Sequence, residues 1–197
     1  GIHPKEIAVE AGYAYEVIKN FSVSATFKYL FSDMGRIGNS RGASSVAFDL
    51  GVLYKCEIND WEGAGWSVGL HVSNLGPKIN YLTSKDALPA TVKVGGAADL
   101  PFLQMHKLTL TADLGYRLSP ADVQALSVSA GAEYAWRELV MLRGGYHCGD
   151  KKKGDASYAT AGAGVEYAGV RLDFAWLFAG HEYLARNTFW VSLGYSF

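Results

Sequence analysis

The side chains best suited to chemistry are five histidines, and their spacing along the chain does not match that of a metal site. His71 falls on the polar side of a predicted strand, and His147 ends another. A serine hydrolase needs a serine, a histidine and an acidic residue close in space but not in sequence, so position alone does not exclude one. The sequence brings no such group together, and we expect no catalytic residue, no metal and no cofactor.

The two cysteines, Cys56 and Cys148, are predicted near opposite ends of the barrel. A disulfide needs Cα atoms within about 7 Å of each other. We therefore expect both thiols to be free and to act as small apolar side chains.

Charged residues fall on one side of an alternation that runs through nearly every segment. Residues 21–32 give the pattern, with apolar Phe21, Val23 and Ala25 interleaved with polar Ser22 and Ser24. The polar side holds Glu10, Lys28, Asp49, Lys93, Asp113, Glu133, Arg143, Glu166, Arg171 and Asp173. The other side is uncharged: Ile7, Val9, Tyr13, Val46, Phe48, Leu50, Val52, Val68, Leu70, Val72, Leu108, Leu110, Leu114, Val128, Leu142, Val165, Leu172, Phe174, Trp176, Val191 and Leu193. Since strand side chains alternate between faces, the pattern predicts a sheet with one apolar and one polar face.

About eleven strands carry this pattern, and most are too long for a soluble domain. They are 5–17, 21–33, 44–56, 64–75, 88–100, 105–117, 125–136, 138–147, 156–168, 169–179 and 187–197. A tilted membrane crossing needs about 9–11 residues. With no predicted helix to cover it, the apolar face needs lipid, where only a closed barrel satisfies every backbone group. We therefore predict an all-β transmembrane antiparallel up-and-down β-barrel, with one barrel domain over 1–197.

The links between strands alternate in length. Short links fall at 18–20, around 59–61, at 103–104, 137–138 and 168–169, and long ones at 34–43, 76–87, 118–124, 148–155 and 180–186. Outer-membrane barrels have short periplasmic turns and longer extracellular loops. This places Phe197 at the periplasmic side, and the odd strand count indicates that this chain is the C-terminal part of a larger barrel.

The chain also resembles a known family. The matching stretches are 13–17, 20–29, 66–70, Ser73-Asn74-Leu75-Gly76-Pro77-Lys78-Ile79, Leu88-Pro89-Ala90-Thr91 with 92–96, 142–146, 171–175 and 192–197. They are similar to the PorV family, also called LptO, of the Bacteroidetes type 9 secretion system, within the FadL-like outer-membrane barrels. The resemblance implies a fourteen-stranded barrel of which this chain is the last eleven strands, lacking the N-terminal plug and first strands.

The resemblance implies a non-enzymatic protein of the bacterial cell outer membrane. Such a protein binds the C-terminal signal domains of cargo at the translocon and shuttles them to the surface sortase of the attachment complex. Its partners would be translocon, cargo proteins, sortase, outer-membrane lipid and lipopolysaccharide. The balance of 18 basic and 19 acidic residues argues against nucleic acid. A FadL-like channel for hydrophobic small molecules and an outer-membrane lipid deacylase are the alternatives.

The extracellular loops are the predicted cargo-binding surface, because interface cores favour apolar and aromatic residues mixed with Arg. The candidates are Met34, Arg36, Ile37, Arg41, Ile79, Tyr81, Leu82, Lys85, Tyr183, Leu184 and Arg186. On the polar face we expect four ion pairs that fill the interior: Glu10 with Lys28, Asp49 with Lys93, Asp113 with Arg143, and Glu133 with Arg171.

Overall fold

The computed structural model describes residues 5–33, 42–80, 85–180 and 188–196. Its main strands are β1 (Lys5–Ile18), β2 (Phe21–Asp33), β3 (Ala43–Glu57), β4 (Gly65–Leu75), β7 (Thr91–Phe102), β8 (His106–Arg117), β9 (Leu126–Trp136), β10 (Val140–Cys148), β11 (Tyr158–Tyr167), β12 (Val170–Ala179) and β13 (Phe189–Tyr195). Within these ranges they form one sheet of eleven strands, each beside the strand before it in the chain. A small hairpin of β5 (Ile79–Asn80) and β6 (Lys85–Asp86) stands between β4 and β7.

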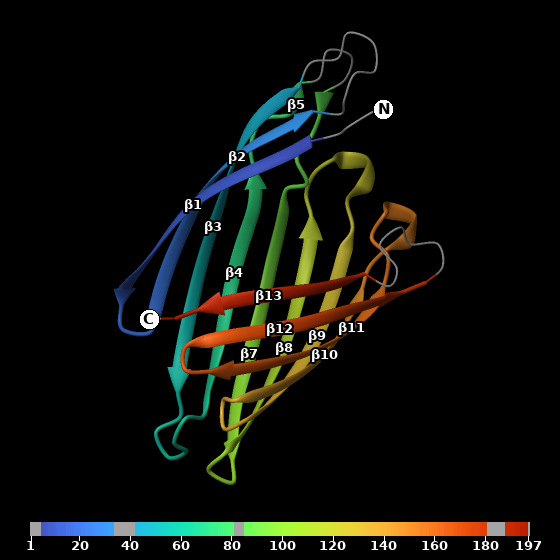
Figure 1. Cartoon of the computed structure of the whole chain (residues 1–197). Coiled ribbons are helices and arrows are strands. Elements are labelled where there is room, and N and C mark those ends of the chain that lie inside the picture. The colour runs from blue at the N-terminus through green and yellow to red at the C-terminus, as the bar shows by residue number, and fades with distance from the viewer. Residues whose placement is uncertain (1–4, 34–41, 81–84, 181–187, 197) are drawn as a thin grey trace. The chain divides into compact units, whose positions relative to one another are not determined.

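The fold is therefore all-β, antiparallel and up-and-down, as the alternation predicts (Figure 1). All eleven predicted strands are present, with ends that differ by up to three residues. β7 begins at Thr91 rather than at Leu88, because Ala90 forms a turn in which its N–H donates to the Leu88 carbonyl at 2.8 Å. No helix in the described part of the chain is long and apolar enough to cross a bilayer.

Contacts divide the chain into two compact units. The first holds β1, β2 and β3 up to Tyr54, together with Gly69–Val94 and Gly115–Gln124. The second holds Lys55–Val68, Gly95–Leu114 and the strands from β9 onward. Every feature discussed below lies within one unit.

The two faces of the strands differ as the sequence predicts. All but three of the predicted apolar-face residues are exposed, and Val46, Val72 and Leu108 are half-buried. Leu193 is 78% exposed and Val191 62% exposed. Soluble monomers rarely expose contiguous apolar patches larger than about 300–600 Å². The strands thus present an apolar face that the chain's own described residues leave largely uncovered.

Three of the five short links are tight turns with two successive left-handed residues, whereas the one around 59–61 spans 58–64. Leu103 and Gln104 have φ of 50° and 57°, Arg137 and Glu138 have 54° and 57°, and Ala168 and Gly169 have 51° and 79°. Two successive left-handed residues define the type I′ turn, whose twist matches that of antiparallel strands. The longer links carry extra structure: β5–β6 in 76–87, a 3₁₀ turn at Ala121–Val123 and another at Lys151–Lys153. The predicted loops 34–43 and 180–186 lie largely outside the described residues.

The β11–β12 turn gives a test of this geometry. Gly169→Ala places a Cβ 2.6 Å from the Ser196 carbonyl oxygen, at a φ of 79° that side chains disfavour. We expect a loss of about 1–2 kcal/mol in the free energy of unfolding, measured by urea titration. Ala168→Gly is the matched control and should not destabilise, because Ala168 already has positive φ. Equal stability of the two variants would contradict the assigned turn.

Candidate functional site

In the first unit, a lysine on the polar face of β1 to β3 lies between two carboxylates. Lys28 Nζ lies 2.7 Å from Asp49 Oδ2 and 3.8 Å from Glu10 Oε1. Asp49 also accepts the backbone N–H of Asn74 at 2.8 Å, and its side chain is only 9% exposed. The predicted Glu10–Lys28 pair is confirmed. The predicted Asp49–Lys93 pair is wrong. Asp49 pairs instead with Lys28, its diagonal neighbour across β2 and β3.

In the second unit an arginine joins three strands. Arg143 on β10 donates from Nε to Glu133 on β9 and from Nη1 to Asp173 on β12. Arg171 donates from Nε to the other oxygen of Asp173 at 2.7 Å and lies 3.7 Å from Glu166. The predicted pairs of Arg143 with Asp113 and of Arg171 with Glu133 are therefore wrong.

Arg143 reaches Asp173 because the intervening strand, β11, has a glycine, Gly164, where the Arg143 side chain crosses it. A Cβ built on Gly164 would lie 2.5 Å from Asp173 Oδ1 and 3.2 Å from Arg143 Nη1. The guanidinium thus crosses β11 where that strand has no side chain. A fork of charge-assisted hydrogen bonds ties β9, β10 and β12 on their polar face.

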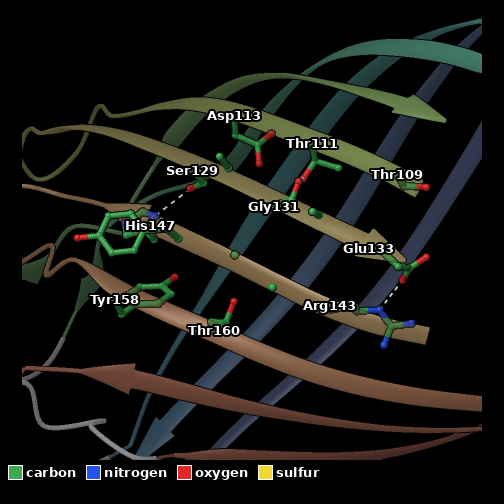
Figure 2. Close-up of a pocket in the computed structure, with 15 residues that line it drawn as sticks. Thr109, Thr111, Asp113, Ser129, Gly131, Glu133, Arg143, His147, Tyr158 and Thr160 are labelled. Carbon is green, nitrogen blue, oxygen red and sulfur yellow. Dashed lines mark hydrogen bonds and ion pairs between the residues drawn. The ribbon is translucent and has the colours of Figure 1, made fainter. Parts of the chain in front are cut away.

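Beside this fork the polar faces of β8 to β11 form a groove of about 460 Å³ (Figure 2). Its floor is low because Gly131 and Gly145, on the same face as Glu133 and Arg143, have no side chains, and hydroxyls of Thr109, Thr111 and Thr160 face it. The pair Glu133 and Arg143 lies at one end, and His147 with Tyr158 at the other. The lining is polar, with carboxylates, hydroxyls and an imidazole available as hydrogen-bonding partners.

Two residues of the groove lining, a serine and a histidine, lie in line with an aspartate of the β10–β11 loop, a group that the sequence does not reveal. Ser129 Oγ lies 2.9 Å from His147 Nδ1, and His147 Nε2 lies 3.1 Å from Asp155 Oδ1. The imidazole stacks on Tyr158 with ring centroids 4.8 Å apart. A neutral imidazole with its proton on Nε2 satisfies both contacts, donating to Asp155 and accepting from Ser129.

The position of Ser129 within a strand does not favour a hydrolase site. Ser129 lies within β9, between β8 and β10, so the amide groups around it point along the sheet. A nucleophilic serine needs N–H donors aimed at the oxyanion that forms above it. The contacts instead close the loop between β10 and β11, where Asp155 N–H donates to the Asp150 carbonyl at 3.1 Å.

In the first unit, two loops border a cleft of about 660 Å³. Its lining residues are Lys78, Asp86, Ala87, Leu118, Ser119, Pro120, Ala121 and Asp122. The loops are fixed to each other because Leu118 N–H and Ser119 N–H both donate to the Ala90 carbonyl, at 2.8 and 3.3 Å. Leu118 is 40% exposed beside charges of both signs. This composition suits contact with another protein.

The structure describes only two of the predicted cargo-binding residues. Ile79 is half-buried in β5 opposite Asp86, and Lys85 begins β6. Outside the described residues lie Met34, Arg36, Ile37, Arg41, Tyr81, Leu82, Tyr183, Leu184 and Arg186. The sequence does not predict the part of the cleft from Leu118 to Asp122, because this short segment of mixed composition has no distinctive signal. Both cysteines, predicted to be unpaired, are free thiols.

These features define an up-and-down antiparallel β-protein with an exposed apolar face, a charge-paired polar face and loops that gather at strand ends. The family model described as type IX secretion system protein PorV matches residues 2–124. The chain therefore belongs to the PorV family of type IX secretion proteins, as its sequence motifs predict. No curated protein matches the chain. The matched region includes the whole lining of the loop cleft.

The arginine fork can be tested at Gly164. Gly164→Val fills the space that Arg143 crosses, so one carboxylate loses its partner. We expect a loss of about 1–3 kcal/mol in urea unfolding. Ala163→Val adds two methyl carbons on the opposite, exposed face of β11 and should be close to neutral. If both variants were equally stable, Arg143 would not depend on the gap in β11.

Proposed function

We propose that this protein is an outer-membrane component of the type IX secretion system. It binds the C-terminal signal domains of cargo at the translocon and carries them to the surface attachment complex with its sortase. Membership of the PorV family supports the involvement in secretion. The observation that carries the membrane location is the exposed apolar face of the strands.

An aqueous location would leave that face in water. Leu110, Val128 and Leu142 are 43%, 47% and 55% exposed; Leu110 and Val128 each lie between polar neighbours, and Leu142 precedes Arg143. Burying apolar surface is worth about 25 cal/mol per Å², so a sheet of this length favours a hydrocarbon phase over water. Strands of 9 to 15 residues, except the shorter β13, are long enough to cross it.

The loop cleft is the proposed contact for cargo. Ile79 and Lys85 belong to the hairpin at its border, and Met34, Arg36, Ile37, Arg41, Tyr81, Leu82, Tyr183, Leu184 and Arg186 are proposed as further loop contacts. Apolar Leu118 and Pro120 beside Lys78 and Asp122 offer a small apolar centre with a charged rim. Loops can vary to fit a partner without disturbing the strands that hold them.

Two alternatives have less support. A channel for hydrophobic small molecules needs an apolar path, whereas the described groove is lined by Asp113, Glu133 and Arg143. A lipid deacylase has the Ser129–His147–Asp155 contacts in its favour, but Ser129 lies within β9, where the amide groups point along the sheet and not at an oxyanion.

The membrane location predicts different losses of folding free energy for arginine substitutions at two adjacent residues of β8. Leu110 is on the exposed apolar face, and Thr111 lines the groove on the other face. Leu110→Arg should cost about 2–4 kcal/mol on folding into lipid vesicles, because a basic side chain meets hydrocarbon. Thr111→Arg should cost much less. Urea titration in vesicles measures both, and an equal cost would remove the argument for lipid on this face.

The cargo contact predicts an effect of Leu118→Glu in cells. The Leu118 main chain makes the loop hydrogen bonds, so the side chain can be changed while the cleft persists. We expect about tenfold less cargo attached at the surface, with the remainder retained in the periplasm, measured by cell fractionation. Leu103→Glu is the matched control, at a tight turn and 79% exposed. Normal attachment in the Leu118 variant would exclude this cleft as the cargo contact.

A further inference from the structure

A cluster of aromatic residues lies on the second unit where β7, β8 and β9 meet their tight turns. We call it the rim cluster, and it consists of Phe102, Met105, His106, Tyr134, Trp136 and Arg137. His106 Nδ1 lies 2.6 Å from the Tyr134 hydroxyl, and Phe102 stacks on His106 with centroids 5.5 Å apart. Glu133 points to the groove, so Tyr134 and Trp136 belong to the opposite, apolar face of β9. The rim cluster therefore lies at the end of the apolar face.

Arg137 is held in the rim cluster by contacts that leave its charge uncompensated. Its backbone N–H donates to the Met105 carbonyl at 2.7 Å, which ties the β9–β10 turn to the β7–β8 turn. Its guanidinium carbon lies 5.4 Å from the centre of the Trp136 ring, and Nε lies 3.1 Å from Met105 Sδ. Within the described ranges Arg137 forms no ion pair with a carboxylate. A stacked guanidinium keeps N–H donors free at its edge.

The position of the Arg137 guanidinium indicates which kind of ligand it can bind. If hydrocarbon covers the apolar face, the strand ends lie at the level of the lipid headgroups, where Trp and Tyr gather. The anion at that level is the phosphate diester of a glycerophospholipid, and guanidinium binds phosphate through paired hydrogen bonds. The exposed side chains of Phe102, Met105 and Trp136 are 40%, 45% and 39% accessible and can pack against the upper acyl chain.

We propose that the rim cluster binds one anionic glycerophospholipid, with Arg137 on its phosphate and Trp136 and Phe102 against its glycerol and first methylenes. This inference rests on the proposed membrane location. It adds a specific lipid site, which an apolar face alone does not require. The site would fix the β7–β8 and β9–β10 turns to one leaflet.

The test uses the protein at the full length that its own cell makes, purified in a neutral detergent. Native mass spectrometry measures the binding of phosphatidylglycerol during a titration. Arg137→Gln should weaken binding of the first lipid about fivefold, the effect of one basic residue at a lipid surface. Lys152→Gln removes the same charge from the exposed 3₁₀ turn after β10 and should leave the first affinity unchanged. Trp136→Leu should weaken binding while the charge is kept.

Three results would overturn the site. These are an unchanged affinity in Arg137→Gln, an equal loss in both charge variants, and competition by millimolar inorganic phosphate with no preference for the lipid. Far-UV circular dichroism of each variant shows whether the sheet is intact, and Arg137→Lys provides a second, milder change. Because binding is measured in detergent, its failure leaves the Leu110 and Thr111 comparison to judge the membrane location separately.

Discussion

The antiparallel hydrogen-bond ladder is the constraint on which this structure depends. Once each strand pairs with its neighbours, side chains have only two directions, and every residue belongs to one face or the other. The chain uses this to separate charged from apolar side chains: Leu142 lies on the apolar face at 55% exposure while its neighbour Arg143 binds two carboxylates. A single-residue slip of β10 would exchange the two environments. The apolar face and the charge-paired face are thus two results of one register.

On the polar face, the absence of side chains matters as much as their charge. Arg143 spans from β9 to β12 only because Gly164 leaves room on β11. The groove beside it has a low floor for the same reason, since Gly131 and Gly145 lie between its hydroxyls. The glycines at these positions thus make space for neighbouring side chains, whereas Gly169 supplies the left-handed conformation of a turn.

The sequence predicts the strands well because alternation is a local property, read along one segment at a time. It does not predict partners as well. A shift of two residues between strands leaves each side chain on its face but changes its neighbour, so faces can be right while pairs are wrong. The predicted Glu10–Lys28 pair is confirmed, because these two residues lie directly opposite each other. Glu133 is predicted to pair with Arg171, but it lies directly opposite Arg143 and pairs with it. The Ser129–His147–Asp155 contacts were missed for the same reason. Ser129 and His147 face each other only once the β9–β10 register is known, and Asp155 approaches through a loop.

The two kinds of link between strands differ in what they can contribute to recognition. A type I′ turn such as Arg137–Glu138 has almost no conformational choice, so its side chains are held at a fixed height above the last ladder pair. Such rigidity suits a flat, uniform ligand such as a leaflet of lipid headgroups. The longer links can contact one another, as Leu118 and Ser119 do with Ala90, and can change composition without altering the ladder. Every strand residue is constrained by the hydrogen-bond ladder. Those on the apolar face are also constrained by the surrounding medium, and those on the polar face by charge pairing, so strand residues have little freedom to match a protein partner. We therefore propose that cargo choice depends on the long loops, and the family match over residues 2–124 includes the proposed loop cleft.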